Sequence, residues 1–267
     1  MKFFLAPMQG LTGYTVRNAF HHHFDYIDKY YTPFIPAAKR MNAKIKRDID
    51  PVNNDGITLI PQAMSIVADE VIDLHRQLVP YGYDEINVNL GCPSGTVVSK
   101  KRGSGILAYP DMLDSFLDEL YTKADFPVSI KTRVGFNDDE LWPRLIEIYS
   151  KYPISELTVH PRVQKDFYKN TPRMDDFALA MQKINPDKTT LCYNGDITDI
   201  NSFNALTDCF PDIDEIMIGR GLFANPALIA ELKGISMDKA ELRERLKNWH
   251  DEILSGYLSI FSGEKDA

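Results

Sequence analysis

The sequence has few cysteines, no long apolar run and no excess of positive charge. Its three cysteines, at positions 92, 192 and 209, are odd in number and lack CxxC spacing, so neither a disulfide framework nor a zinc site is indicated. No apolar run reaches the ~18 residues of a membrane span. The apolar start, Met1–Met8, gives way to Gln9 too early for a signal peptide. We therefore expect a cytoplasmic protein that binds no metal and no membrane.

Positive charge is scarce overall but locally concentrated. The chain has 38 acidic and 30 basic side chains, a net charge of −8, which argues against indiscriminate binding of nucleic acid. Two runs carry basic residues without an acidic one: Lys39, Arg40, Lys44, Lys46 and Arg47, and then Lys100, Lys101 and Arg102. Such runs are commonly solvated faces, yet they also suit a partner with a phosphate backbone. Composition leaves both interpretations open.

Short apolar segments alternate with amphipathic ones along the chain. The strands expected from this pattern are 3–8, 26–33, 58–63, 85–90, 128–133, 156–160, 190–194 and 215–219. The helices between them are expected at 67–78, 112–123, 140–149, 176–184, 201–209 and 227–232. About eight strand–helix repeats with nearly continuous apolar strands are typical of a parallel (β/α)8, or TIM, barrel. A doubly wound sheet is the alternative, but no GxGxxG follows the first strand.

Two regions depart from this alternation. Residues 34–57 combine a basic run with a turn-rich stretch and are expected to form a long surface excursion after the second strand. Near the C-terminus the pattern is helical only, with stretches at 238–246 and 249–260. We therefore expect an α/β barrel over 1–235 and a short C-terminal helical appendage over 236–267.

The most informative single feature is Cys92, which lies where an apolar strand breaks into a loop. Residues 84–89 alternate in polarity as a strand does, and the Gly- and Pro-rich residues 91–95 stop that strand from continuing. A thiol at such a junction is partly exposed and held on a rigid support, as reactive groups commonly are. Cys192 and Cys209 are expected instead to be small buried side chains.

Most of the predicted strands end in polar or charged side chains, which a barrel brings together at its C-terminal rim. They include Gln62, Asn89, Lys131, Arg133, His160, Asn194, Asp196 and Arg220. Lys131 suits a Schiff base or an anion contact, although a solvated strand end is the ordinary alternative. His160 could act as an acid or base or bind a ligand, and a purely local hydrogen-bonding role is equally expected. Asn194–Asp196 and Gly219–Gly221 follow the last two strands, where barrels build phosphate sites.

Taken together, these segments resemble the tRNA-dihydrouridine synthases, FMN-dependent enzymes of the barrel class. The resemblance runs from residue 5 to about residue 229. It rests on Leu5-Ala-Pro-Met-Gln-Gly10, Asn89-Leu-Gly-Cys-Pro-Ser94 followed by Gly103-Ser-Gly105, Ser129-Ile-Lys-Thr-Arg133, Leu157-Thr-Val-His-Pro-Arg162, Tyr193-Asn-Gly-Asp-Ile197 and Met217-Ile-Gly-Arg220. The cysteine–proline loop followed by GxG is the most specific of these segments.

The resemblance implies a role for each matching residue. The wall beside the flavin ring of FMN corresponds to Pro7, Met8 and Gln9. The polar contacts of that ring correspond to Gln62, Asn89, Lys131 and His160. The residues that bind the ribityl chain and phosphate correspond to Asn194, Gly195, Asp196, Gly219 and Arg220. Cys92 corresponds to the family's general acid.

The resemblance also implies the reaction. NADPH reduces FMN, hydride passes to C6 of a uridine in tRNA, and Cys92 gives a proton to C5. A thiol with the ordinary pKa near ~8.5 is mostly protonated at neutral pH and suits that role. Lys131 and Arg133 would stabilise the negative charge that develops on the base. The uridine must leave its stacked position to reach a barrel mouth, and the two basic runs would then meet RNA phosphates.

Two features depart from the family pattern. After His160 the family usually has an Arg-Thr pair and a later glycine, whereas this chain has Arg162-Val-Gln-Lys and Tyr168-Lys-Asn170. The helical tRNA-docking domain, at 236–267, is about half the usual length and is interpreted as a partial one. We expect flavin binding to survive this shortening, but not necessarily modification of RNA.

Three alternatives stay open. A dihydroorotate-dehydrogenase-like FMN oxidoreductase would carry a similar Asn-x-x-Cys-Pro segment. A phosphate-sugar aldolase would use Lys131 as its Schiff base and bind no flavin. A non-catalytic RNA-binding relic would be consistent with the short C-terminal region. NADH is an alternative to NADPH as the reductant, and a monomer is the default expectation for the oligomeric state.

Overall fold

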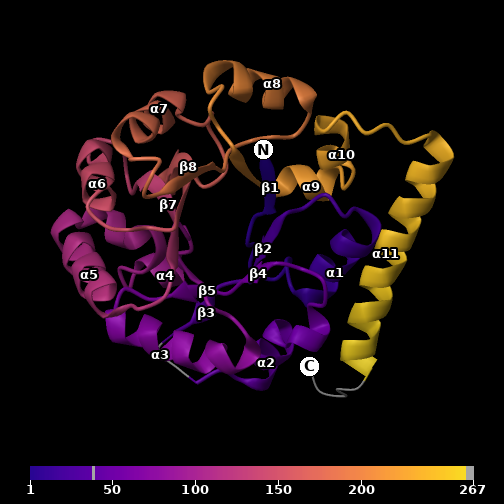
Figure 1. Ribbon diagram of the computed structural model, residues 1–267, viewed down its shortest axis with the longest axis horizontal. Coiled ribbons are helices and arrows are strands. Elements are labelled where there is room, and N and C mark those ends of the chain that lie inside the picture. Colours follow the sequence, from indigo (N-terminus) through magenta and orange to yellow (C-terminus); the bar gives the residue numbers. More distant parts are fainter. Residues whose placement is uncertain (38–39, 263–267) are drawn as a thin grey trace.

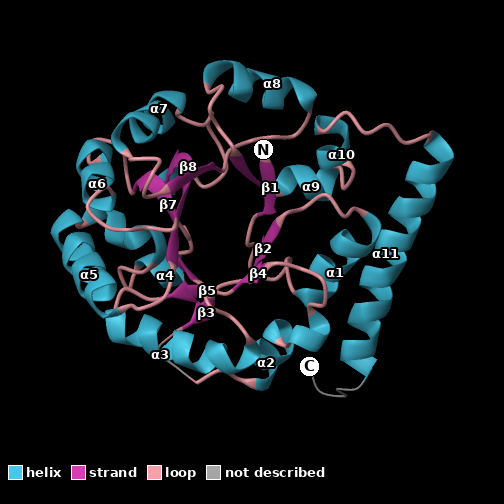
Figure 2. Ribbon diagram, in the orientation of Figure 1, coloured by secondary structure: helices cyan, strands magenta, loops and turns pink. Residues whose placement is uncertain are grey.

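The computed structural model describes residues 1–37 and 40–262, and its strands lie in a ring inside a layer of helices (Figure 1, Figure 2). The strands are β1 Lys2–Leu5, β2 Lys29–Tyr31, β3 Ile35–Pro36, β4 Leu59–Ile60, β5 Gln62–Met64, β6 Ile86–Leu90, β7 Val128–Gly135, β8 Glu156–Val163, β9 Thr190–Tyr193 and β10 Glu215–Ile218. Within the described residues they form one parallel sheet in the order β3-β5-β6-β7-β8-β9-β10-β1-β2-β4.

The ring closes through the third predicted strand, which Pro61 divides into β4 and β5. On one side β4 pairs with β2, and on the other β5 pairs with β6. Proline lacks the N–H that a ladder needs, so a break in the strand is expected there. The two ends of the sheet therefore meet, and the chain folds as the predicted (β/α)8 barrel. All eight predicted strands are present, and β3 is an additional short one.

The helices alternate with the strands around the outside of the ring. They are α1 Tyr14–His23, α2 Ala43–Ile49, α3 Ala68–Leu78, α4 Gly95–Val98, α5 Pro110–Lys123, α6 Trp142–Tyr149, α7 Met174–Lys183, α8 Ile200–Cys209, α9 Arg220–Ala224, α10 Leu228–Leu232 and α11 Lys239–Ser262. Short 3-10 turns cover Pro51–Asn53, Val79–Tyr81, Gly103–Ala108 and Gln164–Asp166. Among the described residues, none of these helices has the length and apolar character that crossing a membrane requires.

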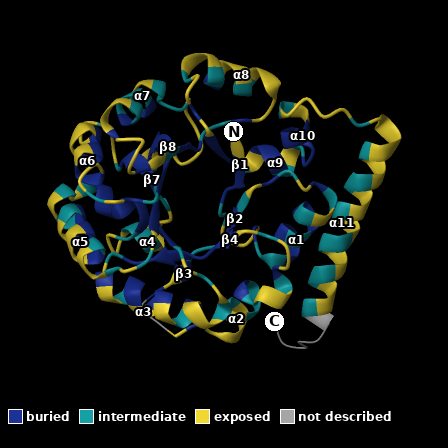
Figure 3. Cartoon of the chain, in the orientation of Figure 1, coloured by how far each residue is buried: buried dark blue, intermediate teal, exposed yellow. Residues whose placement is uncertain are grey.

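Side chains of β1 alternate between two apolar clusters. In β1, Phe3 and Leu5 pack in the large cluster shared with the helices, whereas Phe4 lies in a small inner cluster with Tyr31 and Cys192. This alternation is the period of two that a strand imposes. Buried residues accordingly concentrate in the strands and on the inner faces of the helices (Figure 3). The inner cluster fills the barrel interior beside β1, β2, β4, β9 and β10.

The region 34–57 is more regular than expected. The predicted excursion contains β3, helix α2 and a 3-10 turn. Helix α2 begins after Asn42, whose side-chain oxygen accepts a hydrogen bond from the N–H of Ile45 at 2.9 Å. Such an N-cap satisfies a donor that the first helical turn leaves free, which is the local reason for the helix. Lys39, the first member of the basic run, lies outside the described residues.

Two further expectations are corrected. The C-terminal stretches 238–246 and 249–260 form one continuous helix, α11, because no proline or cap separates them. Cys209 is exposed, since it is the last residue of α8, whereas Cys192 is buried as predicted. Helix α11 lies along the outside of the barrel beside α1 (Figure 1). The rings of Trp249 and Phe20 meet there at 5.3 Å between centroids.

Candidate active site

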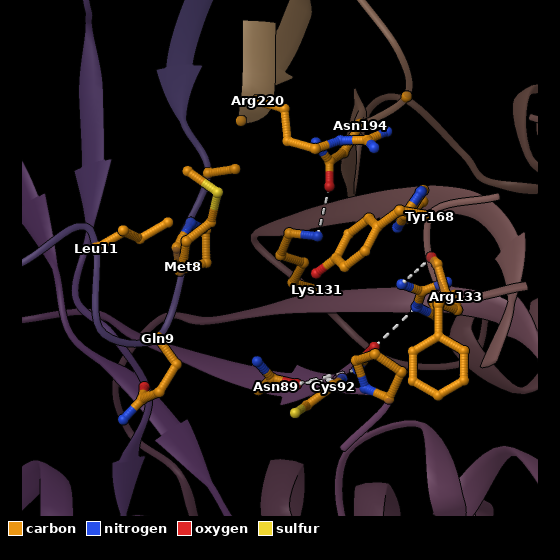
Figure 4. Close-up of a pocket in the computed structure, with 18 of the residues that line it drawn as sticks. Met8, Gln9, Leu11, Asn89, Cys92, Lys131, Arg133, Tyr168, Asn194 and Arg220 are labelled. Carbon is orange, nitrogen blue, oxygen red and sulfur yellow. Dashed lines mark hydrogen bonds between the residues drawn. The ribbon is translucent and has the colours of Figure 1, made fainter. Parts of the chain in front are cut away.

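A cavity of about 490 Å³ opens at the C-terminal ends of the barrel strands (Figure 4). Sites for small molecules and cofactors commonly measure about 300–1,000 Å³. Every residue predicted for the site lines this cavity: Pro7, Met8, Gln9, Gln62, Asn89, Cys92, Lys131, Arg133, His160, Asn194, Gly195, Asp196, Gly219 and Arg220. The barrel therefore assembles the site from strand ends around its whole ring.

The loop that carries Cys92 is fixed through its backbone. Asn89 Oδ1 accepts hydrogen bonds from the N–H groups of Gly91 at 3.1 Å and Cys92 at 2.9 Å. Ser104 donates its N–H at 3.1 Å and its hydroxyl at 2.8 Å to the carbonyl of Cys92. The thiol is half-buried, and burial raises the pKa of Cys92 despite nearby positive charges. Cys92 therefore keeps its proton at neutral pH.

A chain of side-chain amides links three strands below the cavity. Asn89 Nδ2 donates to Gln62 Oε1 at 2.7 Å, and Gln62 Nε2 donates to Asn87 Oδ1 at 2.8 Å. Asn87 Nδ2 continues the chain to the hydroxyl of Ser129 at 3.0 Å. Because these buried amides bind one another, their orientations are set before any ligand enters. They form a rigid polar floor for the cavity.

Lys131 lies beside this floor, since it is the register partner of Asn89 on the neighbouring strand β7. Its Nζ donates to Asn194 Oδ1 at 2.5 Å, and Asn194 Nδ2 donates to the carbonyl of Met217 at 2.8 Å, which fixes the amide (Figure 4). Burial, with the neighbouring charge of Arg133, lowers the pKa of Lys131 to about 7. At neutral pH the side chain is thus divided between ammonium and amine. It can supply a positive charge or a proton to a ligand.

His160 is a neutral member of the site. Burial lowers its pKa well below the ordinary value, and the charges of Arg133 and Lys131 act in the same direction. The guanidinium of Arg162 approaches His160 Nε2 at 3.2 Å. Since an arginine can only donate, Nε2 accepts and the neutral ring carries its proton on Nδ1. His160 is therefore a hydrogen-bonding group at neutral pH.

Arg133, on β7, binds backbone at the ends of both neighbouring strands, β6 and β8. Its Nε donates to the carbonyl of Gly91 at 2.9 Å, and its two terminal nitrogens donate to the carbonyls of Val163 at 3.0 Å and Phe167 at 2.8 Å. The side chain is buried. Arg133 thus ties the Cys92 loop to the loop that follows β8, while its charge remains within the site.

The predicted phosphate region holds an acidic residue between two arginines. Asp196 accepts hydrogen bonds from Arg162 and, at 2.6 Å, from Arg220. Burial alone would raise the pKa of Asp196, but the bonds and charges of these arginines outweigh it and lower the pKa. Asp196 is therefore ionised and orients both guanidinium groups at this end of the cavity.

Sequence reasoning missed an apolar and aromatic rim. It consists of Leu11, Phe34, Phe167 and Tyr168. The Tyr168 ring lies 6.3 Å from that of His160 and 5.0 Å from the guanidinium carbon of Arg220. The adjacent aromatic pair was visible in the sequence. The positive φ of Phe167, +52°, which turns the loop toward the cavity, was not.

Comparison with known proteins identifies the family. Residues 4–255 match the protein-family model described as Dihydrouridine synthase (Dus). The chain belongs to this family. The resemblance predicted from the strand-end motifs is thereby confirmed.

Individual dihydrouridine synthases show how far the likeness extends. tRNA-dihydrouridine synthase B of Pasteurella multocida is 26% identical over 243 residues, which cover 88% of this chain and 69% of that protein. A probable tRNA-dihydrouridine synthase of Staphylococcus aureus is 32% identical over 195 residues, 71% of this chain and 56% of that protein. tRNA-dihydrouridine synthase B of Escherichia coli is 30% identical over 65% of this chain and 53% of its own length. The chain thus spans about half to two thirds of these relatives.

Solved structures support the barrel. A variant of NCR from Zymomonas mobilis superposes with a TM-score of 0.59 at 11% identity, covering 93% of this chain and 90% of that one. Morphinone reductase gives a TM-score of 0.58 at 11% identity, covering 90% and 88%. At such low identity the likeness shows the fold alone.

Proposed function

We propose that this chain is a flavin-dependent oxidoreductase that reduces a uridine in tRNA to 5,6-dihydrouridine, with FMN as its cofactor and NADPH as the reductant. Membership of the dihydrouridine synthase family supports the reaction class. The observation that carries the proposal is that a protonated thiol, Cys92, and a partly buried lysine, Lys131, line the same 490 Å³ cavity. An acid and a cation in one enclosed site suit the reduction of a pyrimidine ring.

The cavity residues fit a flavin nucleotide. Pro7, Met8 and Gln9 offer a wall for the ring, and the amide floor with Lys131 and His160 offers it polar contacts. The ribityl chain and phosphate would be held by Asn194, Gly195, Asp196, Gly219 and Arg220. Gly219 is close-packed, since a Cβ there would lie 3.3 Å from the Cβ of Ala6 and 3.6 Å from the sulfur of Met8. A side chain at Gly219 would therefore narrow the space available to the cofactor.

The protein's own residues would manage the proton and the charge. When bound, reduced flavin supplies the hydride that adds to C6 of uracil. Cys92 holds its proton until negative charge develops on the base, and the raised pKa of the thiol keeps it in the acid form. Lys131 would stabilise that charge through its ammonium form. Arg133 would add its charge and hold the Cys92 loop in place, since backbone carbonyls accept from all three of its nitrogens.

The RNA partner would lie over the cavity mouth. A target uridine must be extruded from its stack to enter, which costs a few kcal/mol unless it is already unpaired. The exposed Lys44 and Lys46 on α2 and Lys100 and Lys101 beside α4 are candidates for phosphate contacts. Arg102 is partly engaged, because it pairs with Glu70 at 3.1 Å. Helix α11 would form part of the tRNA-docking region.

The test is dihydrouridine formation on tRNA transcribed without modifications, with FMN and NADPH supplied. Cys92→Ala is expected to lose at least about 100-fold in rate, the usual contribution of a positioned acid. Cys209→Ala is the matched control, because that cysteine is exposed on α8 and does not line the cavity. Wild-type activity in Cys92→Ala, or a wild-type protein that binds no FMN, would overturn the proposal.

The lowered pKa of Lys131 also favours a second candidate, a Schiff-base aldolase. Family membership and the protonated thiol of Cys92, whose loop is held by Asn89 of the amide floor, support the reductase instead. Borohydride treatment with a phosphorylated keto sugar separates the two. Covalent trapping on Lys131 in a protein that stays colourless with FMN would support the aldolase.

A further inference from the structure

Arg17 is a buried arginine of α1 that does not line the cavity. One terminal nitrogen donates to the carbonyl of Thr12 at 2.7 Å and to Asp48 Oδ2 at 3.2 Å. The other donates to the carbonyl of Asp48 at 2.6 Å and to Asn54 Oδ1 at 2.8 Å, and Nε reaches the same Asn54 oxygen at 3.3 Å. The planar fork of one guanidinium thus joins the segment 8–12 to the segment 48–54.

The first of these segments is a wall of the cavity. Met8, Gln9 and Leu11 line it. The segment is a compact turn in which the Thr12 hydroxyl accepts from the N–H of Met8 at 2.9 Å and the Thr12 N–H donates to the carbonyl of Met8 at 3.1 Å. Gly10, with φ +80°, completes the turn. Because the turn is closed on itself, holding the Thr12 carbonyl holds the whole wall.

The second segment is the end of the basic helix α2. Asp48 lies in its last turn, and Lys44 and Lys46 are exposed on the same helix. Asp48 Oδ1 also accepts from the N–H of Tyr14 at 2.7 Å, at the first turn of α1. That turn has no acidic residue and no side-chain cap of its own, so Asp48 supplies the negative charge that a helix start favours.

We propose that Arg17 is a positioning residue that couples the basic helix α2 to the cavity wall Met8–Thr12. The identity of the two ligands, RNA phosphate at α2 and flavin at the wall, rests on the proposed function. The coupling between α2 and the wall does not. Arg17, Asp48 and Asn54 form a buried polar cluster whose members satisfy one another, so α2 and the wall move as one unit. A polyanion that immobilises α2 would thereby order the wall beside the cofactor.

The first experiment needs no flavin. Hydrogen exchange of the amides of residues 8–12 is compared in the wild type, Arg17→Lys and Asn18→Ala. Arg17→Lys keeps a positive charge beside Asp48 but removes the planar guanidinium that joins the two segments. Asn18 is the matched control, because it lies next in α1 and binds the same second segment, through the carbonyl of Asn53 at 2.9 Å, without touching the wall. We expect exchange about tenfold faster in Arg17→Lys and within about twofold of the wild type in Asn18→Ala.

The second experiment measures FMN binding and the response to unmodified tRNA. Arg17→Lys is expected to weaken FMN binding about tenfold, and tRNA should slow exchange of residues 8–12 in the wild type but not in this variant. If Arg17→Lys does not fold, Asn54→Ala removes the acceptor of two guanidinium nitrogens and should give the same effects in weaker form. Equal behaviour of the position-17 and position-18 variants overturns the coupling. A wild type without FMN affinity defeats the proposed function, while the exchange data still decide the coupling.

Discussion

Gly103 lies so close to Cys92 that no side chain fits between them. A Cβ on Gly103 would stand 2.8 Å from the carbonyl oxygen and 3.0 Å from the Cβ of Cys92, and the φ of Gly103 is +55°. The glycine therefore lets the loop after β6 fold back onto the cysteine, where Ser104 binds the same carbonyl. The GxG that follows the cysteine–proline loop has a geometric role, which is to close that loop around the thiol.

Gly103→Ala should displace Cys92 without emptying the site. Both the contact with a backbone carbonyl and the left-handed φ oppose a Cβ at this position. We expect dihydrouridine formation to fall about tenfold or more while FMN affinity changes little. Gly95→Ala is the control in the same loop, because a Cβ there meets no described atom within 4 Å. Equal rates in the two variants would refute the role assigned to Gly103.

The titration of Lys131 predicts a pH-dependent stability. Burial, with Arg133, lowers its pKa from 10.5 to about 7 in the folded protein. Because the pKa of Lys131 is lower in the folded protein, protonation of this lysine favours the unfolded state. The resulting loss of unfolding free energy is absent above the unfolded-state pKa, grows as the pH falls and is complete below the folded-state pKa. The unfolding free energy of the wild type, relative to that of Lys131→Met, should therefore rise from about pH 7 to about pH 10. Urea unfolding of both proteins measures this difference, and a difference that does not change with pH would contradict the lowered pKa of Lys131.

Helix α11 meets α1 at a glycine. A Cβ on Gly256 would overlap the Cγ2 of Thr15, a buried residue. Gly256→Ala should cost about 1–3 kcal/mol through overpacking, partly offset by about 1 kcal/mol of helix propensity. In a Thr15→Ala background the same change should cost little, because the clashing methyl is gone. Denaturant unfolding of the four proteins checks this, and additive effects would exclude the contact.

The basic helix α2 predicts a salt-dependent contribution to RNA binding. Replacing Lys44 and Lys46 with glutamine should weaken tRNA binding and reduce the slope of log affinity against log salt by about 1 for each phosphate that a lysine neutralises. Lys188→Gln is the control, since Lys188 is exposed on the loop before β9, at the opposite end of the barrel from the cavity. If the double variant kept the wild-type slope of log affinity against log salt, α2 would not be part of the RNA-binding surface.

The strand ends could be predicted because parallel strands of a barrel converge by symmetry. Once Lys131 and His160 were located at the C-terminal ends of their strands, the barrel fold itself predicted that they lie at the same rim. The family resemblance then supplied roles that periodicity alone left open. The barrel, the cavity lining and the burial of Cys192 were all within reach of the sequence for these reasons.

Features set by loop conformation were not predictable in the same way. Tyr168 reaches the cavity because Phe167 adopts a positive φ, a backbone conformation that neither residue type predicts. The partners of Arg133 are backbone carbonyls, which no sequence pattern marks. The partners of Arg17 lie in two segments, and the fold alone brings the second, around Asp48, beside α1.

Single-turnover oxidation of the flavin by tRNA tests the central claim most directly. The protein is loaded with FMN, reduced without oxygen and mixed with unmodified tRNA while the flavin absorbance is followed. With Cys92 as the proton donor, the wild type should reoxidise with formation of dihydrouridine, and Cys92→Ala should do so at least about 100-fold more slowly with FMN affinity unchanged. Equal rates for the two proteins would contradict the account.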